Sequence, residues 1–595
     1  MRIGSVIYWQ WILVISHLSF FTAFAQDLQI PLHRYWQISF LKGDNTWNWR
    51  GDLIYGIENN SGLGFSLDYH INPNLLIQRL NEQKWRDESK LIAFLYTRFT
   101  DDYFGIYINS WSLVNKQTDL VNRYSNHALG IRSVYHINEN VLIKPYLGYQ
   151  RSENKSYIDF GWDVGIDAAI KRMYLGDYRT NLFIDSEFDI YPQRENISNQ
   201  IGLNIQKQFS SLARDSLRIT YTKTKQQYYY SPLQPFVNVD LESKNLDNVL
   251  NYTLSSRSYL QLNTIIADRR ISDDTPINPN VRKVFRIENR LGYAYFSPKF
   301  LLYLGMHTFE ETQDNVDIRT DSKAAQIGLR TDFSLLFADT DRLDFQVDLI
   351  KFQYDTPAIE ENYDDRDEIR LVGQTRFYHQ FSPLLSVNLN GYVNLYHSMY
   401  IYKAQSANNN WNRIYRIEAS VKYKHQQLIT TLRTQVLANY TTYDYDHLFS
   451  IPKSFVFRKY SVSDSLVLPI FNKTFCDLYA RLELEDRGSF YKELFAQNIL
   501  ESSQIVYLDV SLRRKSFLRL DIDFGCAIYQ RKNWRHLPLT VEIRDISRLS
   551  PYIKIIYPLQ RSLHLIAQVT QNYQSDSGRE RSEYIYGKLD LYYIL

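Results

Sequence analysis

The chain has 595 residues, a formal net charge of +3 and only two cysteines. The balanced charge gives no whole-chain argument for nucleic acid as a partner, and two cysteines provide neither a disulfide framework nor a four-ligand zinc site. We find no Gly-rich phosphate loop and no His/Cys cluster with ligand spacing, so we predict no cofactor, no metal and no catalytic residues. Aromatic residues make up 15% of the chain, and 48 of them are tyrosines.

The first 25 residues have the features of a secretory signal. Arg2 precedes the apolar run VIYWQWILVISHLSFF, and Ala23, Phe24 and Ala25 fit the small-x-small pattern of a cleavage site. An uncleaved anchor helix is the alternative. We therefore predict that the chain is exported from the cytoplasm.

A short stretch occurs twice, as YHINPNLLI at 69–77 and as YHINENVLI at 135–143. Apolar and polar residues alternate before each copy, which is the period of a β-strand. Asn and Pro are typical turn residues. We therefore predict that each copy is the tip of a β-hairpin, with new strands beginning at Leu75 and Val141.

Further short turns with alternating flanks follow along the chain, and connections between them are longer, polar and irregular. The spacing between turns is mostly about 40 residues, which indicates a supersecondary repeat. One end of the strand array should therefore carry tight turns and the other long loops. The predicted turns lie near Asp102, Gly176, Ala213, Ser256, Thr340, Gln426, Arg487 and Lys515, and within 295–304, 378–389 and 557–566.

Several predicted strands have one apolar and one charged face. In DFGWDVGID, at 159–167, the aromatic and aliphatic residues share one face and the aspartates share the other with glycines. We predict that the charged faces line a wet lumen, where they form salt bridges or set ion selectivity. The lumen-facing candidates are Asp159, Asp163, Asp344, Asp348, Arg519, Asp521, Asp523, Lys588 and Asp590.

The last segment, EYIYGKLDLYYIL, alternates to the end of the chain. A strand at a terminus is a liability at the edge of a water-soluble sheet, whereas a closed barrel pairs it. This pattern resembles large bacterial outer-membrane β-barrels of the Bacteroidota type, although those usually finish on an aromatic residue and this chain finishes on Leu595. The resemblance implies surrounding outer-membrane lipid and insertion by the barrel-assembly machinery.

The predicted fold is therefore all-β, a transmembrane antiparallel up-and-down barrel with short periplasmic turns and long extracellular loops. Counting hairpins gives roughly 26–28 strands of roughly 10–14 residues, an even number as single-chain bacterial barrels require. The predicted division is a signal peptide at 1–25, a short N-terminal segment at 26–46 and the barrel at 47–595. TonB-dependent transporters carry a plug domain ahead of their barrel, and residues 26–52 are too few for one.

The leading functional hypothesis is a polar conduit without chemistry. It is either porin-like or the barrel subunit of an export or assembly system with a periplasmic or lipoprotein partner. One alternative is an outer-membrane hydrolase, since YDDRDE at 363–368 and TYDYDH at 442–447 supply carboxylates and a histidine. Neither places a nucleophile beside a base, so we expect solvated loops. The other alternative is a secreted, soluble β-rich binding protein.

Overall fold

The computed structural model describes residues 35–43, 46–59, 61–79, 82–117, 120–154, 157–229, 236–274, 280–338, 340–357, 363–448, 452–517, 520–558, 563–578 and 581–594. The predicted signal peptide, Arg519 and Leu595 lie outside these residues. Within the described ranges, no helix is long and apolar enough to cross a membrane.

Almost all of the described chain is strand. The first half contains β1 (Tyr35–Lys42), β2 (Thr46–Glu58), β3 (Leu63–Ile71), β4 (Asn74–Arg79), β5 (Glu82–Phe99), β6 (Asp102–Gln117), β7 (Leu120–Asn138), β8 (Val141–Asn154), β9 (Tyr157–Leu175), β10 (Tyr178–Ile190), β11 (Glu195–Gln208), β12 (Ala213–Tyr228), β13 (Val237–Ser255), β14 (Ser258–Asp273) and β15 (Asn280–Ser297). The second half contains β16 (Phe300–Asn315), β17 (Ser322–Ala338), β18 (Asp341–Asp355), β19 (Arg366–Ser382), β20 (Leu385–Tyr400), β21 (Asn410–His425), β22 (Leu428–Tyr443), β23 (Phe455–Phe471), β24 (Thr474–Tyr491), β25 (Ala496–Phe517), β26 (Leu520–Arg535), β27 (Val541–Pro558), β28 (Leu563–Asp576) and β29 (Ser582–Ile594). Short 3-10 helices lie in three described connections, η2 (Ile318–Thr320), η3 (Ser406–Asn408) and η4 (Asp446–Leu448).

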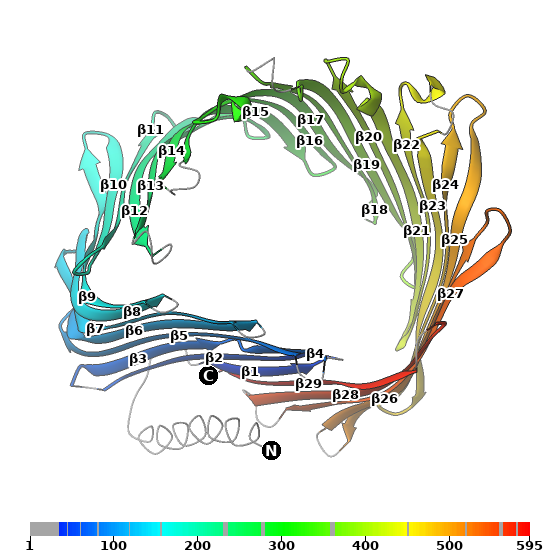
Figure 1. The fold of residues 1–595 in the computed structure, drawn as a ribbon, viewed down its shortest axis with the longest axis horizontal. Coiled ribbons are helices and arrows are strands. Elements are labelled where there is room, and N and C mark those ends of the chain that lie inside the picture. Colours follow the sequence, from blue (N-terminus) through cyan, green and yellow to red (C-terminus); the bar gives the residue numbers. More distant parts are fainter. Residues whose placement is uncertain are drawn as a thin grey trace.

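The strands form one closed antiparallel sheet (Figure 1). The last strand, β29, returns to the first, β1, and pairs with it along its length, from Tyr35 opposite Ile594 to Lys42 opposite Gly587. Closure removes both edges of the sheet, so a strand at the end of the chain has its hydrogen-bonding partner. The prediction of an all-β, up-and-down barrel is confirmed.

The barrel starts earlier than the sequence predicts. We expected residues 26–46 to form a segment ahead of a barrel that begins at 47, but β1 lies within that segment and pairs with both β2 and β29. β1 has only eight residues, so its alternation covers a short window of the sequence. The sheet is closed through these eight residues.

The first copy of the repeated stretch does not form the predicted hairpin. Strands β3 and β4 both pair with β2 on one side and with β5 on the other, so they are two parts of one interrupted strand. The pairing register with β2 is the same before and after the interruption at Asn72 and Pro73. The ladder continues there, because the Asn72 amide donates to the Glu88 carbonyl (2.8 Å) and the Pro73 carbonyl accepts from the Trp49 amide (2.9 Å).

The second copy does form the predicted hairpin. Strands β7 and β8 pair from Tyr135 opposite Ile143 toward the turn at Glu139 and Asn140. The Asn138 side chain closes this turn, since its Oδ1 accepts hydrogen bonds from the amides of Asn140 (2.8 Å) and Val141 (3.0 Å). Such an Asx turn is the turn chemistry that the sequence predicts.

Because β3 and β4 share one position, the 29 strands occupy 28 positions around the barrel, as the predicted range allows. From β5 onward the strands have 13 to 22 residues, more than predicted. Crossing a membrane takes about 9–11 tilted strand residues, so these strands reach past a hydrocarbon layer. The three longest connections, 356–365, 401–409 and 444–454, lie at one end, and the other end carries turns of two to four residues.

A second predicted turn, near Arg487, is also wrong. Arg487 lies inside β24, and the chain turns instead at Asn472 and Lys473, between β23 and β24. The turn-like residues of EDRGSF lie instead at an irregularity within the strand. The pairing of β24 with β25 shifts there, between Arg487 and Gly488, as it does at a β-bulge. The turn predicted near Lys515 falls at 518–519, outside the described residues.

The apolar and polar faces are placed as in a membrane barrel and not as in a soluble sandwich. On β9, the side chains of Phe160 and Trp162 are 49% and 52% exposed, whereas Asp163 is 5% exposed. The Tyr107 hydroxyl on β6 donates to Asp163 across two intervening strands (3.0 Å), and side chains converge in this way on the concave side of a curved sheet. The acidic face of β9 is therefore the inner face, and the apolar face points outward.

Candidate functional site

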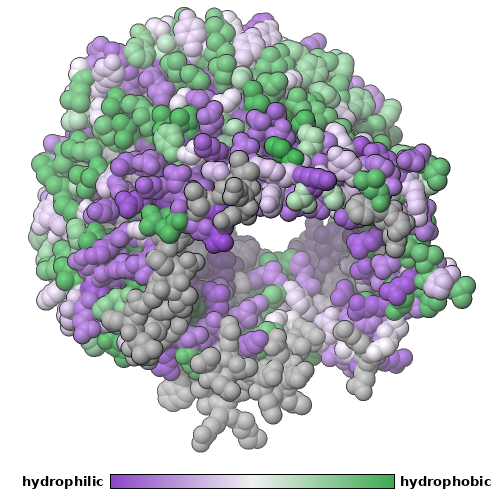
Figure 2. Space-filling model, turned by 45° about the horizontal axis from the view of Figure 1, so that its top comes forward, coloured by the Kyte–Doolittle hydropathy of each residue, from purple (hydrophilic) through white to green (hydrophobic). Residues whose placement is uncertain are grey.

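The polar inner wall of the barrel is the candidate functional site. Figure 2 shows hydrophilic residues around an opening through the molecule, with apolar residues concentrated on the outer surface above it. The lumen candidates named from the sequence do not converge on one point. They lie on four separate strands of the barrel, with Asp159 and Asp163 on β9, Asp344 and Asp348 on β18, Asp521 and Asp523 on β26, and Lys588 and Asp590 on β29.

Several of these residues form ion pairs along their own strand. Arg342 Nε lies 2.7 Å from Asp344 Oδ1, and Lys588 Nζ lies 2.8 Å from Asp590 Oδ2. Residues two apart on a strand point to the same side, so the spacing in the sequence brings each cation to its anion. At these two pairs, on β18 and β29, the charge of the wall is therefore locally balanced.

Asp523 borders a cavity of about 430 Å³ beside the closing seam. The Tyr552 hydroxyl in this cavity donates to Asp509 Oδ1 (3.1 Å). Acidic residues, basic residues and several tyrosines line this cavity. It can therefore offer hydrogen bonds and aromatic ring faces to a solute, but its charge is not of one sign. Its lining includes Asp509, Asp523, Arg548, Tyr552, Lys554 and Tyr584.

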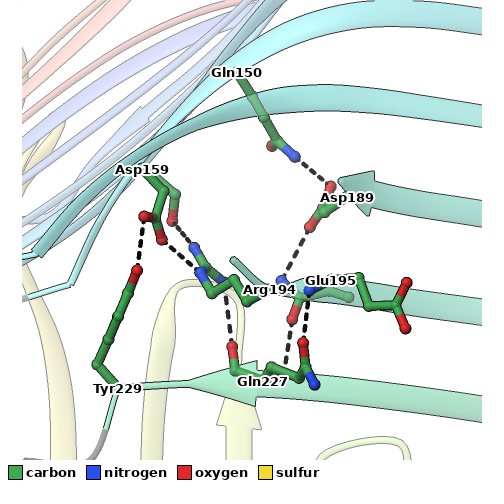
Figure 3. A network of polar contacts seen from close by, with 9 residues as sticks. Gln150, Asp159, Asp189, Arg194, Glu195, Gln227 and Tyr229 are labelled. Carbon is green, nitrogen blue, oxygen red and sulfur yellow. Dashed lines mark hydrogen bonds and ion pairs between the residues drawn. The ribbon is translucent and has the colours of Figure 1, made fainter. Parts of the chain in front are cut away.

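A network around Arg194 joins the ends of several strands (Figure 3). Arg194 lies in the connection between β10 and β11, and its side chain is 7% exposed. Its Nε donates to Asp159 Oδ2 (2.6 Å), and its other nitrogens donate to Ser152 Oγ (2.9 Å) and to the Gln227 carbonyl (3.2 Å). The guanidinium also lies 3.9 Å from the ring centre of Tyr191. Arg194 thus ties β8, β9 and β12 together at the end that carries the long connections.

Two tyrosines in these connections ionise later than usual. The Tyr229 hydroxyl donates to Asp159 Oδ1 (2.8 Å), and burial together with this hydrogen bond raises the pKa of Tyr229 to about 12. Burial and the charge of Asp189 raise the pKa of Tyr191 to about 12 as well. Both phenols therefore remain neutral donors over the physiological pH range.

Below this network, three carboxylates meet on the inner wall. Asp163 on β9 stands directly opposite Asp189 on β10, and Glu187 is two residues away on the same face. One oxygen from each of the three lies within 4.8 Å of the other two. Gln150 Nε2 donates to Asp189 Oδ1 (2.6 Å), and Asn196 Nδ2 donates to Asp189 Oδ2 (3.3 Å). Such a group of hard oxygen donors is the kind that divalent cations prefer.

Glycines make room for the tyrosines that cover this cluster. A Cβ atom at Gly165 would lie 2.3 Å from the Tyr146 ring, and one at Gly148 would lie 2.4 Å from the Tyr107 hydroxyl oxygen. The rings of Tyr107 and Tyr146 meet edge to face with centres 5.8 Å apart. Gly165 on β9 and Gly148 on β8 therefore serve ring packing on the inner wall.

The carboxylates of the two loops considered for a hydrolase hold their connections in place. Asp446 Oδ1 accepts a hydrogen bond from the Lys453 amide (2.6 Å), and Asp365 Oδ1 accepts one from the Thr356 amide (2.7 Å). Asp444 Oδ2 lies 2.9 Å from His397 Nε2. These contacts give the carboxylates a structural use.

Arg194, Glu187 and Asp189 are not among the residues predicted from the sequence. The two acidic residues had a usable signal, since Asp185, Glu187 and Asp189 recur at every second position in IDSEFDI. Their approach to Asp163 depends on the register between β9 and β10, which the sequence does not reveal. Arg194 lies in a connection, where strand alternation gives no information.

No protein-family model and no curated protein sequence matches the chain. Among solved structures, the chain is similar to the copper transporter OprC, at 10% identity and a TM-score of 0.38 over 91% of this chain and 82% of that one. It is also similar to BauA, the ferric preacinetobactin receptor from Acinetobacter baumannii, at 10% identity and a TM-score of 0.38 over 85% and 90%. The siderophore receptor PirA from Pseudomonas aeruginosa matches at 9% identity and a TM-score of 0.35 over 85% and 86%. Likeness this weak does not indicate what this chain transports or binds.

Proposed function

We propose that this chain spans the bacterial outer membrane as an open, water-filled conduit for polar solutes and performs no chemistry of its own. The observation that carries the proposal is the opening through the described part of the barrel, bordered largely by hydrophilic residues (Figure 2). A barrel of 28 positions encloses more space than its wall side chains fill. The interleaved ion pairs of the wall suit passage of polar solutes of either sign.

Membrane insertion is supported by the outer surface. Large apolar side chains such as Phe160 and Trp162 point outward and are half exposed, which would be unfavourable in water. In the resembling barrels, long loops face the exterior and short turns face the periplasm, so the longest connections here would be extracellular. Outer-membrane lipid is then the main contact of the outer wall, and the barrel-assembly machinery is the expected insertion partner.

The second candidate function is the barrel subunit of an export or assembly system. The width of the barrel favours it, because barrels of 16–18 strands already leave an aqueous channel and a wider one would leak. In that case a periplasmic or lipoprotein partner would close the passage or feed a polymer into it. The same polar wall would serve either function.

Liposome swelling tests the proposal. Refolded protein in liposomes is diluted into isosmotic solutions of neutral sugars of increasing size, and heat-modifiable gel mobility verifies that it is folded and inserted. An open conduit predicts swelling whose rate falls as the sugar grows. Inserted protein that gives no swelling with any sugar would contradict the open conduit and favour the partner-gated barrel. Protein that folds in buffer and does not insert would contradict the membrane location.

A further inference from the structure

We propose that Asp163, Glu187 and Asp189 form a calcium-binding site on the inner wall of the barrel. Asp163 and Asp189 are a directly opposed cross-strand pair of like charge. Such a pair destabilises a sheet unless something positive lies between its members. The proposal goes beyond the conduit and requires neither conduction nor a protein partner.

A second observation points to a ligand at the same place. Asp163 is 5% exposed, and its Oδ1 is buried without a hydrogen-bond partner, while its Oδ2 accepts from Tyr107 (3.0 Å). Burying a carboxylate oxygen without a donor costs free energy that nearly all folded proteins avoid. A cation bound against Asp163 would supply the missing interaction.

The protein's own cations are elsewhere. Within the described chain, no Lys, Arg or His nitrogen lies within 4.0 Å of a carboxylate oxygen of Asp163, Glu187 or Asp189. The next acidic pair on the same two strands, Asp167 opposite Asp185, differs because Lys144 Nζ lies 2.7 Å from Asp167 Oδ2. Among the described residues, no side chain supplies a corresponding positive charge at Asp163. A cation from solution would have to supply it.

The donor set suits calcium better than magnesium. Calcium accepts about six to eight oxygen ligands in flexible geometry, whereas magnesium needs near-octahedral geometry and gives up its water molecules reluctantly. Three carboxylates from two neighbouring strands, with one oxygen of each within 4.8 Å of the other two, offer hard oxygen donors in an irregular arrangement. The exposed Glu187 side chain leaves a route for the ion and for the water molecules that complete its shell.

Terbium luminescence tests the site in the folded, full-length protein in detergent. Terbium replaces calcium at oxygen sites and emits when a nearby tyrosine is excited, and the Tyr107 hydroxyl already contacts Asp163. The test variant is Asp163→Asn with Glu187→Gln. The control is Asp344→Asn with Asp348→Asn, which removes the same two charges from β18, where Arg342 lies beside Asp344.

We expect saturable terbium emission from the wild-type protein and the control, competed by calcium in the range of about 10⁻⁴–10⁻³ M that extracellular calcium sites show. The test variant should lose this emission while keeping its heat-modifiable mobility. Emission that is absent in the wild-type protein, or equal in the test variant, would overturn the proposal. If the test variant does not fold, Glu187→Gln alone should weaken terbium binding at least tenfold, and unchanged binding would overturn it.

Discussion

Asp159 and Asp163 lie four residues apart on the same face of β9, but their surroundings are opposite. Asp159 accepts from Arg194 (2.6 Å) and Tyr229 (2.8 Å), so its charge is matched within the protein. Asp163 faces Asp189, and its Oδ1 has no hydrogen-bond partner. A buried carboxylate must be paired, protonated or bound to a cation. Asp159 therefore holds the ends of neighbouring strands together. Asp163 instead makes the inner wall sensitive to the cations in the lumen.

Glu288 on β15 shows that the difference is not one of burial. Its exposed fraction is 3%, close to that of Asp163, yet Arg286, Arg290 and His307 surround it. The Arg286 guanidinium is 2.7 Å from its Oε2, and His307 Nε2 is 3.2 Å from its Oε1. The inner wall thus contains equally buried carboxylates of two kinds, internally paired and unpaired.

The largest expected effect comes from Asp159→Asn. This change leaves the buried Arg194 guanidinium without its ion-pair partner, and breaking a buried pair costs about 3–5 kcal/mol. Urea unfolding in lipid vesicles, followed by tryptophan fluorescence, measures the loss. Asp163→Asn is the matched control on the same strand, with an expected loss below about 1 kcal/mol. Equal losses would show that the two carboxylates do not differ as described.

Glu288→Gln should cost about 1.5–3 kcal/mol of unfolding free energy, because hydrogen bonds to a charged group are lost and the Arg286 and Arg290 guanidinium groups then repel each other. The same unfolding measurement applies, with Glu187→Gln in the presence of a chelator as the control. Glu187 has no such cations beside it, so its replacement should cost nothing measurable. A larger loss for Glu187→Gln would reverse the comparison.

Gly165→Ala tests the ring packing above the acidic cluster. The new Cβ atom would lie 2.3 Å from the Tyr146 ring, and overpacking of this kind costs about 1–3 kcal/mol. Gly328→Ala is the control, since its Cβ atom would have no neighbour closer than 3.6 Å. If both variants unfold at the same urea concentration, Gly165 is not required for the packing of Tyr146.

Asp189→Asn should stabilise the barrel by about 0.2–1 kcal/mol in chelator, because it removes the charge directly opposite Asp163. Calcium should then stabilise the wild-type protein and have little effect on the variant. Unfolding curves with and without calcium measure both effects. A variant that is destabilised in chelator would show that Asp189 acts through its hydrogen bonds from Gln150 and Asn196 and not through its charge.

The last effect is confined to alkaline pH and concerns the Arg194 network. The folded-state pKa of Tyr229 is about 12, above the ordinary tyrosine value of about 10. Its contribution to stability is therefore complete below about pH 10 and is lost as the pH rises from about 10 to about 12. Ultraviolet titration of tyrosinate should show one fewer late-ionising group in Tyr229→Phe and an earlier ionisation in Asp159→Asn. An unchanged titration in both variants would contradict the assignment.

The fold could be predicted from the sequence because a strand with two different faces leaves a period of two. The alternation in DFGWDVGID placed Asp159 and Asp163 on one face, and the structure puts both on one side of β9. The same signal does not distinguish a turn from an interrupted strand. Pro73 lacks an amide hydrogen wherever it lies, so NPN at 72–74 has turn composition even though the ladder continues past it.

The site was less predictable because its chemistry depends on which residues face each other across strands. A shift of one residue between β9 and β10 would put Asp163 opposite an apolar residue and remove the like-charge pair. The cation beside Asp159 comes from a connection, and the one beside Asp344 comes from its own strand. Sequence spacing identifies only the second kind.

Single-channel conductance of the refolded protein in a planar lipid bilayer tests the central claim most directly, namely that the polar inner wall surrounds an open passage. The account predicts large, steady openings. Calcium should lower the preference of the channel for cations over anions in the wild-type protein. It should not change this preference in the Asp163→Asn, Glu187→Gln variant. Protein that inserts in its folded form and conducts no current under any condition would contradict it.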